Sequence, residues 1–400
     1  MSIDILRGFT ILVMIFVNDL AGVAGVPGWM KHAPTLHDGM TFVDWVFPAF
    51  LFIVGMSIPF SIGRRIEKGE KLSSVWKHIL VRVIGLLILG VYMVNGEVIS
   101  NHGIINPNLW ILLVYVFAVI IWNKNSSRDF LLSRRWVKYL AVAGLIALFF
   151  LYRGGDQSGI IQMRHYWWGI LGLIGWAYLI ACLFYIPLRN SQTGLVGAVA
   201  LLYLLYLAAS AGMLKSLPLI EGMMNVGSTL GSHAAIVLSG VILGNKLGAN
   251  LELPNHKSIL RWSFGFSIYL LIAALLLHQL NRLDTMFIIS KNLATVPWCL
   301  LSSVFTIWIW LAVYWLLDMK GYSSWSKVIE PAGLNPLFAY ILAPLVVECF
   351  ALSALLFNGF DVYSWLGNSF WLGFSRALLI AFLMTWLPGY LGRRGLQLKL

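Results

Sequence analysis

The sequence predicts an all-α protein: a polytopic transmembrane bundle of about twelve helices in a single domain, residues 1–400. Three observations predict this class. The chain is 60% hydrophobic and 11% charged. Its mean hydropathy is +0.82. Its apolar runs are continuous, as in 268–277, whereas strands of a membrane barrel alternate apolar and polar residues.

The apolar runs follow one another in order along the chain, separated by short polar turns. The expected spans are 3–24, 43–63, 78–98, 109–123, 137–152, 166–187, 194–213, 228–245, 259–280, 295–317, 331–354 and 370–391. The first run is too long for the apolar core of a signal peptide and lacks a small-residue cleavage site, so we expect a retained helix. Asn335-Pro336 should break the helix in the eleventh span.

The distribution of Lys and Arg predicts the orientation. With the N-terminus inside, most basic residues fall in inner segments. The outer segments hold only Lys31, Arg153, Arg164, Lys215, Arg282 and Lys291. Basic loops stay on the cytoplasmic side, so we expect an N-in, C-in topology. A net charge of +12 would suggest nucleic acid in a soluble protein, but here it reflects the inner loops, and no nucleic-acid partner is expected.

Acids and histidines gather toward the predicted outer face. Asp38, Glu97 and Glu348 are examples of the acids, and His102 of the histidines. One explanation is that acids tolerate translocation whereas Lys and Arg do not. The other is that anionic ligands meet the inner mouth and an amine or a sugar meets the outer one.

The first hairpin concentrates the candidate functional residues. His32 lies in the turn and suits proton removal near neutral pH, with Asp44 best placed to orient its ring. Asn18 is placed either to stabilise an oxyanion or to hydrogen-bond a neighbouring helix. Arg7 near the inner surface either clamps a phosphate or snorkels to lipid headgroups. A lone loop histidine is also a common surface residue.

Metal chemistry is not expected. Cys182, Cys299 and Cys349 are odd in number and lie in apolar runs without the spacing of metal ligands. His32 and His37 lack a convincing third ligand for zinc.

Several motifs in order resemble the heparan-α-glucosaminide N-acetyltransferase family. The resemblance is dense over 2–63. It is carried by Asp4-Ile5-Leu6-Arg7-Gly8, Phe16-Val17-Asn18, Lys31-His32-Ala33 and Asp44-Trp45-Val46-Phe47-Pro48, and continues in 226–247, Lys291-Asn292-Leu293 and Gly333-Leu334-Asn335. Gly169-Ile170-Leu171-Gly172-Leu173 stands where the family has Gly-Val-Leu-Gln-Arg, so the Gln-Arg pair is missing. Residues 100–152 look like a two-helix insertion relative to the family.

The resemblance implies transfer of an acetyl group from cytoplasmic acetyl-CoA, as co-substrate, to an amino sugar or glycan outside the cytoplasm. It places the catalytic histidine on His32, the active-site asparagine on Asn18 and the nearby aspartate on Asp44. With them we expect substrate-binding roles for Asp19, Lys31, His37, Asn292 and Asn335, and cofactor-binding roles for Arg7, Arg64 and Arg65.

The expected partners are the acceptor, the lipid bilayer of a bacterial inner membrane and a second copy of the chain in a homodimer. The residues alone leave two other classes of function open, a transporter and a membrane scaffold. In a transporter of sugars or small metabolites, the same polar residues would bind a solute without chemistry. In a membrane scaffold, His32 would be dispensable.

Overall fold

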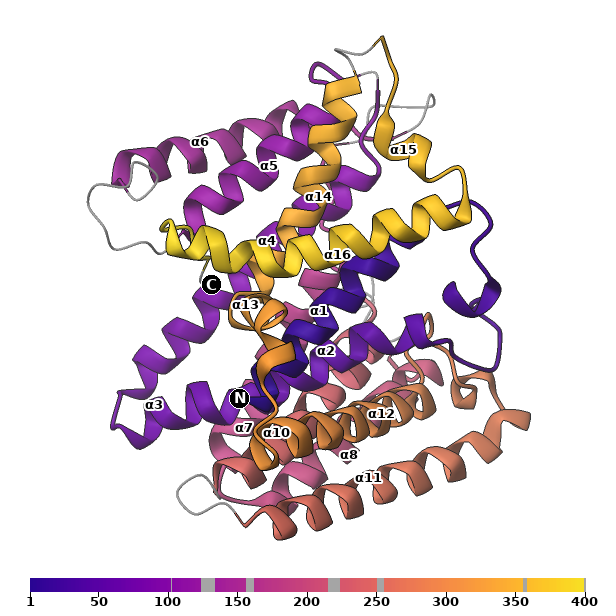
Figure 1. The fold of residues 1–400 in the computed structure, drawn as a ribbon. Coiled ribbons are helices and arrows are strands. Elements are labelled where there is room, and N and C mark those ends of the chain that lie inside the picture. Colours follow the sequence, from indigo (N-terminus) through magenta and orange to yellow (C-terminus); the bar gives the residue numbers. More distant parts are fainter. Residues whose placement is uncertain are drawn as a thin grey trace. The chain divides into compact units, whose positions relative to one another are not determined.

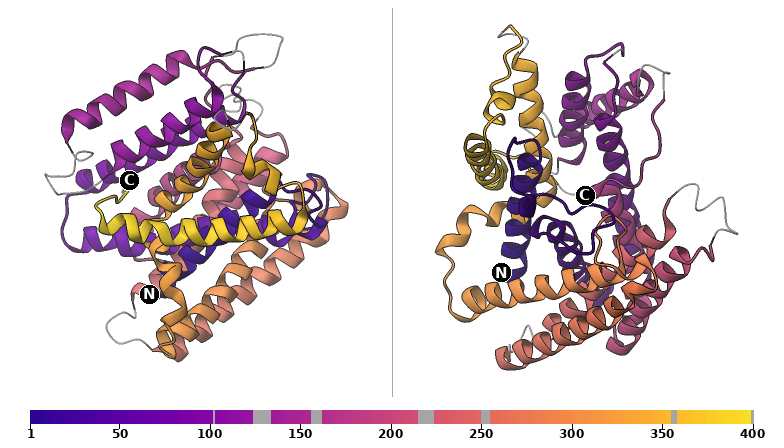
Figure 2. Two further views of the ribbon diagram at one scale, coloured as in Figure 1. Left: turned by 45° about the horizontal axis from the view of Figure 1, so that its top comes forward. Right: turned by 90° about the vertical axis from the view of Figure 1, so that its right-hand side faces the viewer.

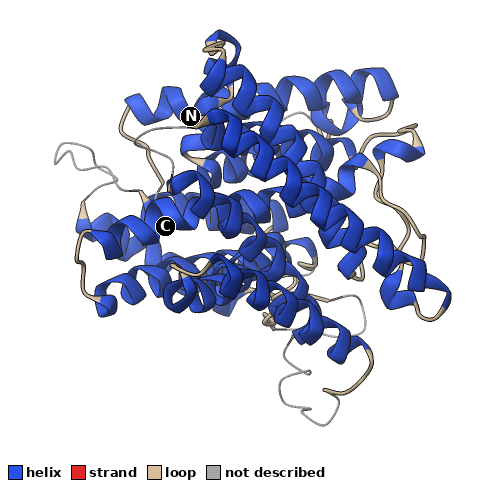
Figure 3. Ribbon diagram, turned by 90° about the horizontal axis from the view of Figure 1, so that it is seen from below, coloured by secondary structure: helices blue, strands red, loops and turns tan. Residues whose placement is uncertain are grey.

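The computed structural model describes residues 1–101, 103–123, 134–155, 162–214, 224–249, 255–354 and 358–398. Over these residues the chain is helical, and it contains isolated bridges but no strand (Figure 3). His102, Lys215 and parts of the expected insertion at 100–152 lie outside these ranges. The chain divides into two compact units, each described by itself: Met1–Leu6, Pro27–Leu87 and Ile170–Ser323 form the first, and Arg7–Val26, Ile88–Gly169 and Ser324–Leu400 the second.

Every expected span coincides with a helix (Figure 1). Nine helical stretches within the described ranges are long and apolar enough to cross a membrane: Phe42–Glu67, Leu72–Glu97, Ile170–Leu188, Gln192–Ser210, Gly227–Gly248, His256–Arg282, Val296–Met319, Pro336–Ser353 and Phe370–Arg393. Helix α1 (Ser2–Leu20), helix α5 (Pro107–Trp122) and helix α6 (Arg135–Leu151) complete the set of twelve ranges. The all-helical membrane class is therefore confirmed, while the number of spans and their orientation stay predictions.

The first unit is built around helix α2, which carries the predicted site residue Asp44. Its elements are η1 (Gly28–Met30), α2 (Phe42–Ile58), η2 (Pro59–Gly63), α3 (Arg64–Glu67), the first part of α4 (Leu72–Glu97), α7 (Ile170–Leu188), α8 (Gln192–Ser210), η4 (Gly227–Ser232), α10 (His233–Gly248), α11 (His256–His278), η5 (Gln279–Arg282), η6 (Thr285–Phe287), α12 (Val296–Tyr314) and η7 (Trp315–Met319).

Small residues bring α2 and α10 into backbone contact. A Cβ atom on Gly55 would lie 1.8 Å from the Val237 carbonyl oxygen, and one on Gly240 would lie 1.9 Å from the Phe52 carbonyl oxygen. Membrane helices approach this closely only where small residues leave room. Toward its N-terminal end α2 is also tied to α12, because Trp45 Nε1 donates to Thr306 Oγ1 at 3.1 Å. These contacts fix the end of α2 that carries Asp44.

The second unit contains the rest of α1 and α4 together with the last third of the chain. Its other elements are α5, α6, η8 (Ser324–Val328), α13 (Glu330–Leu334), α14 (Pro336–Ser353), α15 (Val362–Leu366) and α16 (Phe370–Arg393). Helices α5 and α6 run side by side (Figure 2), joined by a hydrogen bond of 2.9 Å from Trp110 Nε1 to the Leu148 carbonyl oxygen. Asn335 separates α13 from α14, which confirms the predicted break at Asn335-Pro336.

Candidate active site

The capping box of α2 fixes the Asp44 carboxylate. Thr41 is the N-cap residue and Asp44 is the third residue of the helix, the position from which a carboxylate reaches back to the N-cap. Asp44 Oδ2 accepts hydrogen bonds from the backbone N–H groups of Thr41 (3.0 Å) and Ala33 (3.1 Å). The side chain is only 1% exposed. One carboxylate oxygen is thus committed to the backbone, which leaves Oδ1 free for another donor.

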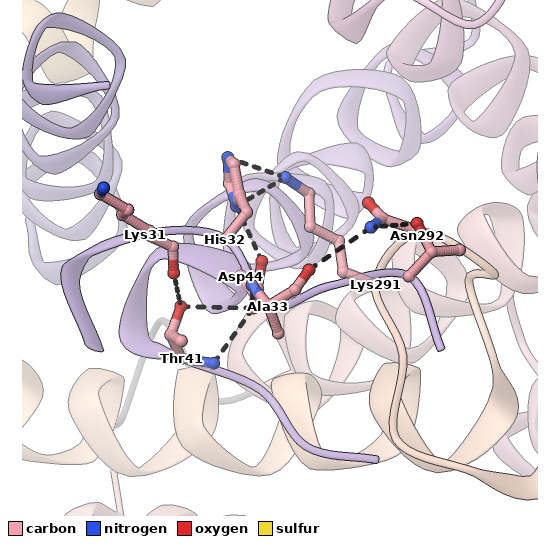
Figure 4. Close-up of polar contacts among 8 residues, drawn as sticks. Lys31, His32, Ala33, Thr41, Asp44, Lys291 and Asn292 are labelled. Atoms are coloured by element: carbon pink, nitrogen blue, oxygen red, sulfur yellow. Dashed lines mark hydrogen bonds and ion pairs between the residues drawn. The ribbon is translucent and has the colours of Figure 1, made fainter. Parts of the chain in front are cut away.

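That donor is His32, whose Nδ1 lies 2.7 Å from Asp44 Oδ1 (Figure 4). An ionised carboxylate only accepts hydrogen bonds, so Nδ1 carries the hydrogen in the neutral ring. The lone pair of the neutral imidazole then lies on Nε2, the atom that can take up a proton. The ring is 46% exposed, so Nε2 is open to an incoming group. This is the geometry of a base held in one tautomer by an acid.

Lys291 adds a cation to this pair. Its Nζ lies 3.0 Å from His32 Nδ1 and 3.1 Å from Nε2. A nitrogen at these two distances would collide with a ring carbon if it lay in the ring plane, so Nζ lies over the ring face. Burial lowers the pKa of Lys291, and the negative charge of Asp44 partly opposes this shift.

A second aspartate anchors the segment that carries Lys291 to the loop that carries His32. Asp38 accepts from the Ile289 N–H (2.8 Å), His278 Nε2 (2.9 Å) and Asn281 Nδ2 (3.0 Å). Burial raises the pKa of Asp38, but the hydrogen bonds from these three residues outweigh it and the net shift is downward. The loop is therefore held against residues 288–295 by an ionised group.

A cavity of about 470 Å³ begins next to this site in the same unit. Asn292 lines it and follows Lys291 directly in the chain; its amide donates to Thr35 Oγ1 at 3.1 Å. Polar side chains also line the cavity: Ser210, Asn225, Ser228, Asp284 and Thr285. The volume falls in the range of small-molecule sites.

The other predicted residues of the first unit lie in exposed or paired positions. Lys31 is exposed, and its carbonyl oxygen accepts from Thr41 Oγ1 at 2.8 Å. His37 is exposed in the same loop. Arg64 is exposed with its guanidinium 5.7 Å from the centre of the Phe60 ring, whereas Arg65 pairs with Glu70 at 3.0 Å. Their binding roles stay predictions.

Four predicted residues belong to the second unit. Asn18 and Asp19 line a cavity there, and Asp19 forms a buried ion pair with Arg376. Arg7 Nη1 donates to the Gly333 carbonyl oxygen at 2.8 Å. In the amide orientation that satisfies both of its polar atoms, the Asn335 side chain makes two hydrogen bonds with Leu398. Its oxygen accepts from the backbone N–H at 3.0 Å, and its nitrogen donates to the backbone carbonyl oxygen at 3.1 Å. The structure does not test the predicted roles of these residues.

The glycine at position 8 allows the backbone at Ile329 to pack closely against α1. A Cβ on Gly8 would lie 2.2 Å from the Ile329 carbonyl oxygen, so the missing side chain makes room for backbone.

Lys291 is the residue that sequence reasoning missed. It lies 259 positions from His32, so no local pattern joins them. Two signals were available: it is one of the few basic residues in a predicted outer segment, and it opens the Lys291-Asn292-Leu293 motif.

Comparison with known proteins agrees with the resemblance seen in the motifs. Residues 1–212 match the family model described as "Domain of unknown function (DUF5009)". The chain is 25% identical over 376 residues to the heparan-alpha-glucosaminide N-acetyltransferase of Mus musculus, and 25% identical over 378 residues to that of Homo sapiens. Each match covers 85% of this chain and 52% of the relative, so the chain spans about half the length of these relatives. The chain belongs to the DUF5009 family, and it is similar to the heparan-alpha-glucosaminide N-acetyltransferases of mouse and human.

Proposed function

We propose that the protein is a membrane acetyltransferase that moves an acetyl group from cytoplasmic acetyl-CoA to the amine of an amino sugar or glycan on the extracytoplasmic side. The names of the relatives support the reaction class. The observation that carries the proposal is the 2.7 Å contact between His32 and Asp44, with the carboxylate otherwise bound to backbone.

The proposed reaction is direct transfer. The acceptor nitrogen attacks the thioester carbonyl carbon, and the C–N bond forms. His32 Nε2 takes the proton from that nitrogen, while Asp44 stabilises the imidazolium at Nδ1. The C–S bond then breaks, and the thiolate of coenzyme A leaves toward the inner side. Oxyanion stabilisation by the Asn18 amide remains a prediction, as does phosphate binding by Arg7, Arg64 and Arg65.

Lys291 has a place in this proposal as a positioning residue. Its Nζ covers one face of the ring, so an acceptor can approach Nε2 only from the remaining directions. Its charge also disfavours a second cation at that face.

We expect His32→Ala to lose transfer of radiolabelled acetyl from acetyl-CoA to glucosamine by about 100-fold or more, because a positioned general base contributes at least that factor. The assay uses the full chain in detergent or proteoliposomes. His165→Ala is the matched control: this exposed histidine of the second unit makes a ring contact with Trp167 and should retain activity.

Normal transfer by His32→Ala would refute the proposal. Solute flux through proteoliposomes without acetyl-CoA consumption would instead support a transporter. Label trapped on wild-type protein without acceptor, and absent from His32→Ala, would replace direct transfer by an acetyl-histidine intermediate.

A further inference from the structure

Lys291 is a primary amine held inside the proposed transfer site. Its Nζ lies 3.0 Å from His32 Nδ1 and 3.1 Å from Nε2, the ring atom proposed to take the proton of the acceptor. Figure 4 shows its side chain directed toward the His32 ring, whereas the side chain of Lys31, which precedes His32 in the chain, points away from it. An amine of the protein itself therefore lies beside the position where the amine of an acceptor must react.

The backbone on both sides of Lys291 is tied to the loop that carries His32. Ser290 Oγ donates to the Thr35 carbonyl oxygen at 2.8 Å, and the Asn292 amide donates to Thr35 Oγ1 at 3.1 Å. These contacts fix where the lysine side chain begins. Its four-carbon stem is flexible, so Nζ can swing from the ring face to the Nε2 edge without a movement of the backbone.

The surroundings of Lys291 favour the uncharged amine more than water does. The side chain is half-buried, and burial lowers the pKa of Lys291, although the charge of Asp44 opposes this shift. The Asp44 carboxylate is already committed to His32 and to backbone N–H groups. Within the described ranges no carboxylate forms an ion pair with Lys291. Lysines that are desolvated in this way act as nucleophiles, because only the uncharged amine has a free lone pair.

We infer that Lys291 is an acetylation site, which takes the acetyl group of acetyl-CoA when no acceptor is present. The inference rests on the proposed function, because it needs the thioester to reach His32. Nζ attacks the thioester carbonyl carbon and the C–N bond forms, while His32 Nε2 takes one proton from Nζ. The C–S bond breaks and coenzyme A leaves as the thiolate. His32 then passes its proton to solvent, and Nζ keeps one hydrogen as an amide.

Acetylation of Lys291 changes the site in two ways. The amide carries no positive charge, so the His32 ring loses the cation over its face. The acetyl group also takes up space beside Nε2, where the acceptor must approach. An amide is more stable than a thioester, so the acetyl group does not return to coenzyme A. The modification therefore stops transfer when acetyl-CoA is abundant and the acceptor is scarce.

The test incubates the full chain in detergent with isotope-labelled acetyl-CoA and no acceptor, and locates the acetyl groups by mass spectrometry. Lys31 is the internal control, because it is exposed and adjacent to His32 in the chain. We expect Lys291 to be acetylated about ten-fold faster than Lys31, or more, and His32→Ala to remove the difference, since a positioned base contributes at least that factor. Hydroxylamine cleaves an acetyl-imidazole but not an amide, so label that survives this treatment is on lysine.

A second measurement tests the inhibitory effect. Wild-type protein incubated with acetyl-CoA should lose transfer to glucosamine in proportion to the fraction of Lys291 that is acetylated. Lys291→Arg should have the same transfer rate before and after that incubation, whatever its starting rate. Glucosamine present during the incubation should protect Lys291 from acetylation.

Equal acetylation of Lys291 and Lys31, in protein that transfers acetyl to glucosamine, would overturn the inference and leave the proposed function standing. Loss of neither residue's amine together with no transfer would refute the proposed function, and the inference with it. Full acetylation of Lys291 with unchanged transfer would overturn its inhibitory effect. If His32→Ala fails to fold, the comparison of the two lysines in the wild-type protein decides the outcome.

Discussion

Asp44→Asn is expected to reduce acetyl transfer by about 100- to 10,000-fold while leaving the protein folded. Two backbone donors converge on Asp44 Oδ2: the N–H groups of Ala33 and Thr41. An asparagine must therefore turn its amide oxygen toward these donors. Its NH₂ group then faces His32 and donates to Nδ1.

This reversal changes the tautomer of His32. When Nδ1 accepts a hydrogen bond, the neutral ring carries its hydrogen on Nε2, the atom that should accept the proton of the acceptor amine. The same substitution in the serine-protease triad is a known example of loss through the wrong tautomer. The transfer rate falls because Nε2 already carries a hydrogen and cannot accept another proton. The variant stays folded because the asparagine oxygen still accepts the capping hydrogen bonds of α2.

The measurement compares transfer rates and melting temperatures of wild type, Asp44→Asn and Asp361→Asn. Asp361 is also a helix-cap aspartate, because its side chain accepts from the Tyr363 N–H at the start of α15. It contacts neither His32 nor Lys291, and this variant should keep its activity. Activity of Asp44→Asn within two-fold of wild type would show that the carboxylate does not orient the base.

Gly240→Ala is expected to lower the free energy of unfolding by about 1–3 kcal/mol. The added Cβ would lie 1.9 Å from the Phe52 carbonyl oxygen and 2.9 Å from its carbon. Backbone atoms cannot rotate away as a side chain can, so α2 and α10 must separate. Because α2 carries Asp44 at its start, we also expect reduced transfer.

Gly248→Ala provides the control on the same helix. Gly248 is the last residue of α10, and a Cβ there would have no atom within 4 Å. This variant should match or exceed wild-type stability, because alanine costs less conformational entropy than glycine in a helix. Thermal unfolding in one detergent compares the three proteins, and equal melting temperatures for both variants would contradict the packing described for α2 and α10.

Much of the fold was predictable because long apolar runs can form only helices in a membrane. Each expected range coincides with a helix, and Pro336 correctly marks the start of α14. The π-helical segments at Pro59–Gly63 and Gly227–Ser232 were not predictable, since they depend on tertiary packing. The division into two units was equally invisible, because no polar linker marks it.

The site was predictable where its parts are close in sequence. His32 and Asp44 are only 12 residues apart, and Asp44 is the third residue of α2, where a carboxylate can reach back toward the preceding loop. The contact of Lys291 with His32 joins two loop segments that are 259 residues apart in the sequence. A single polar residue on an apolar helix does not reveal its partner from the sequence. The catalytic role of His32 was predicted from the family resemblance. A single histidine in a loop does not by itself indicate catalysis.

The central claim is that His32 and Asp44 act as one catalytic unit, and the transfer rate of the double variant His32→Ala/Asp44→Asn tests it most directly. If Asp44 works only through the imidazole, the double variant should be no slower than His32→Ala alone, because groups that act together are not additive. A double variant whose loss equals the product of the two single losses would show that the two residues act independently and would contradict the claim.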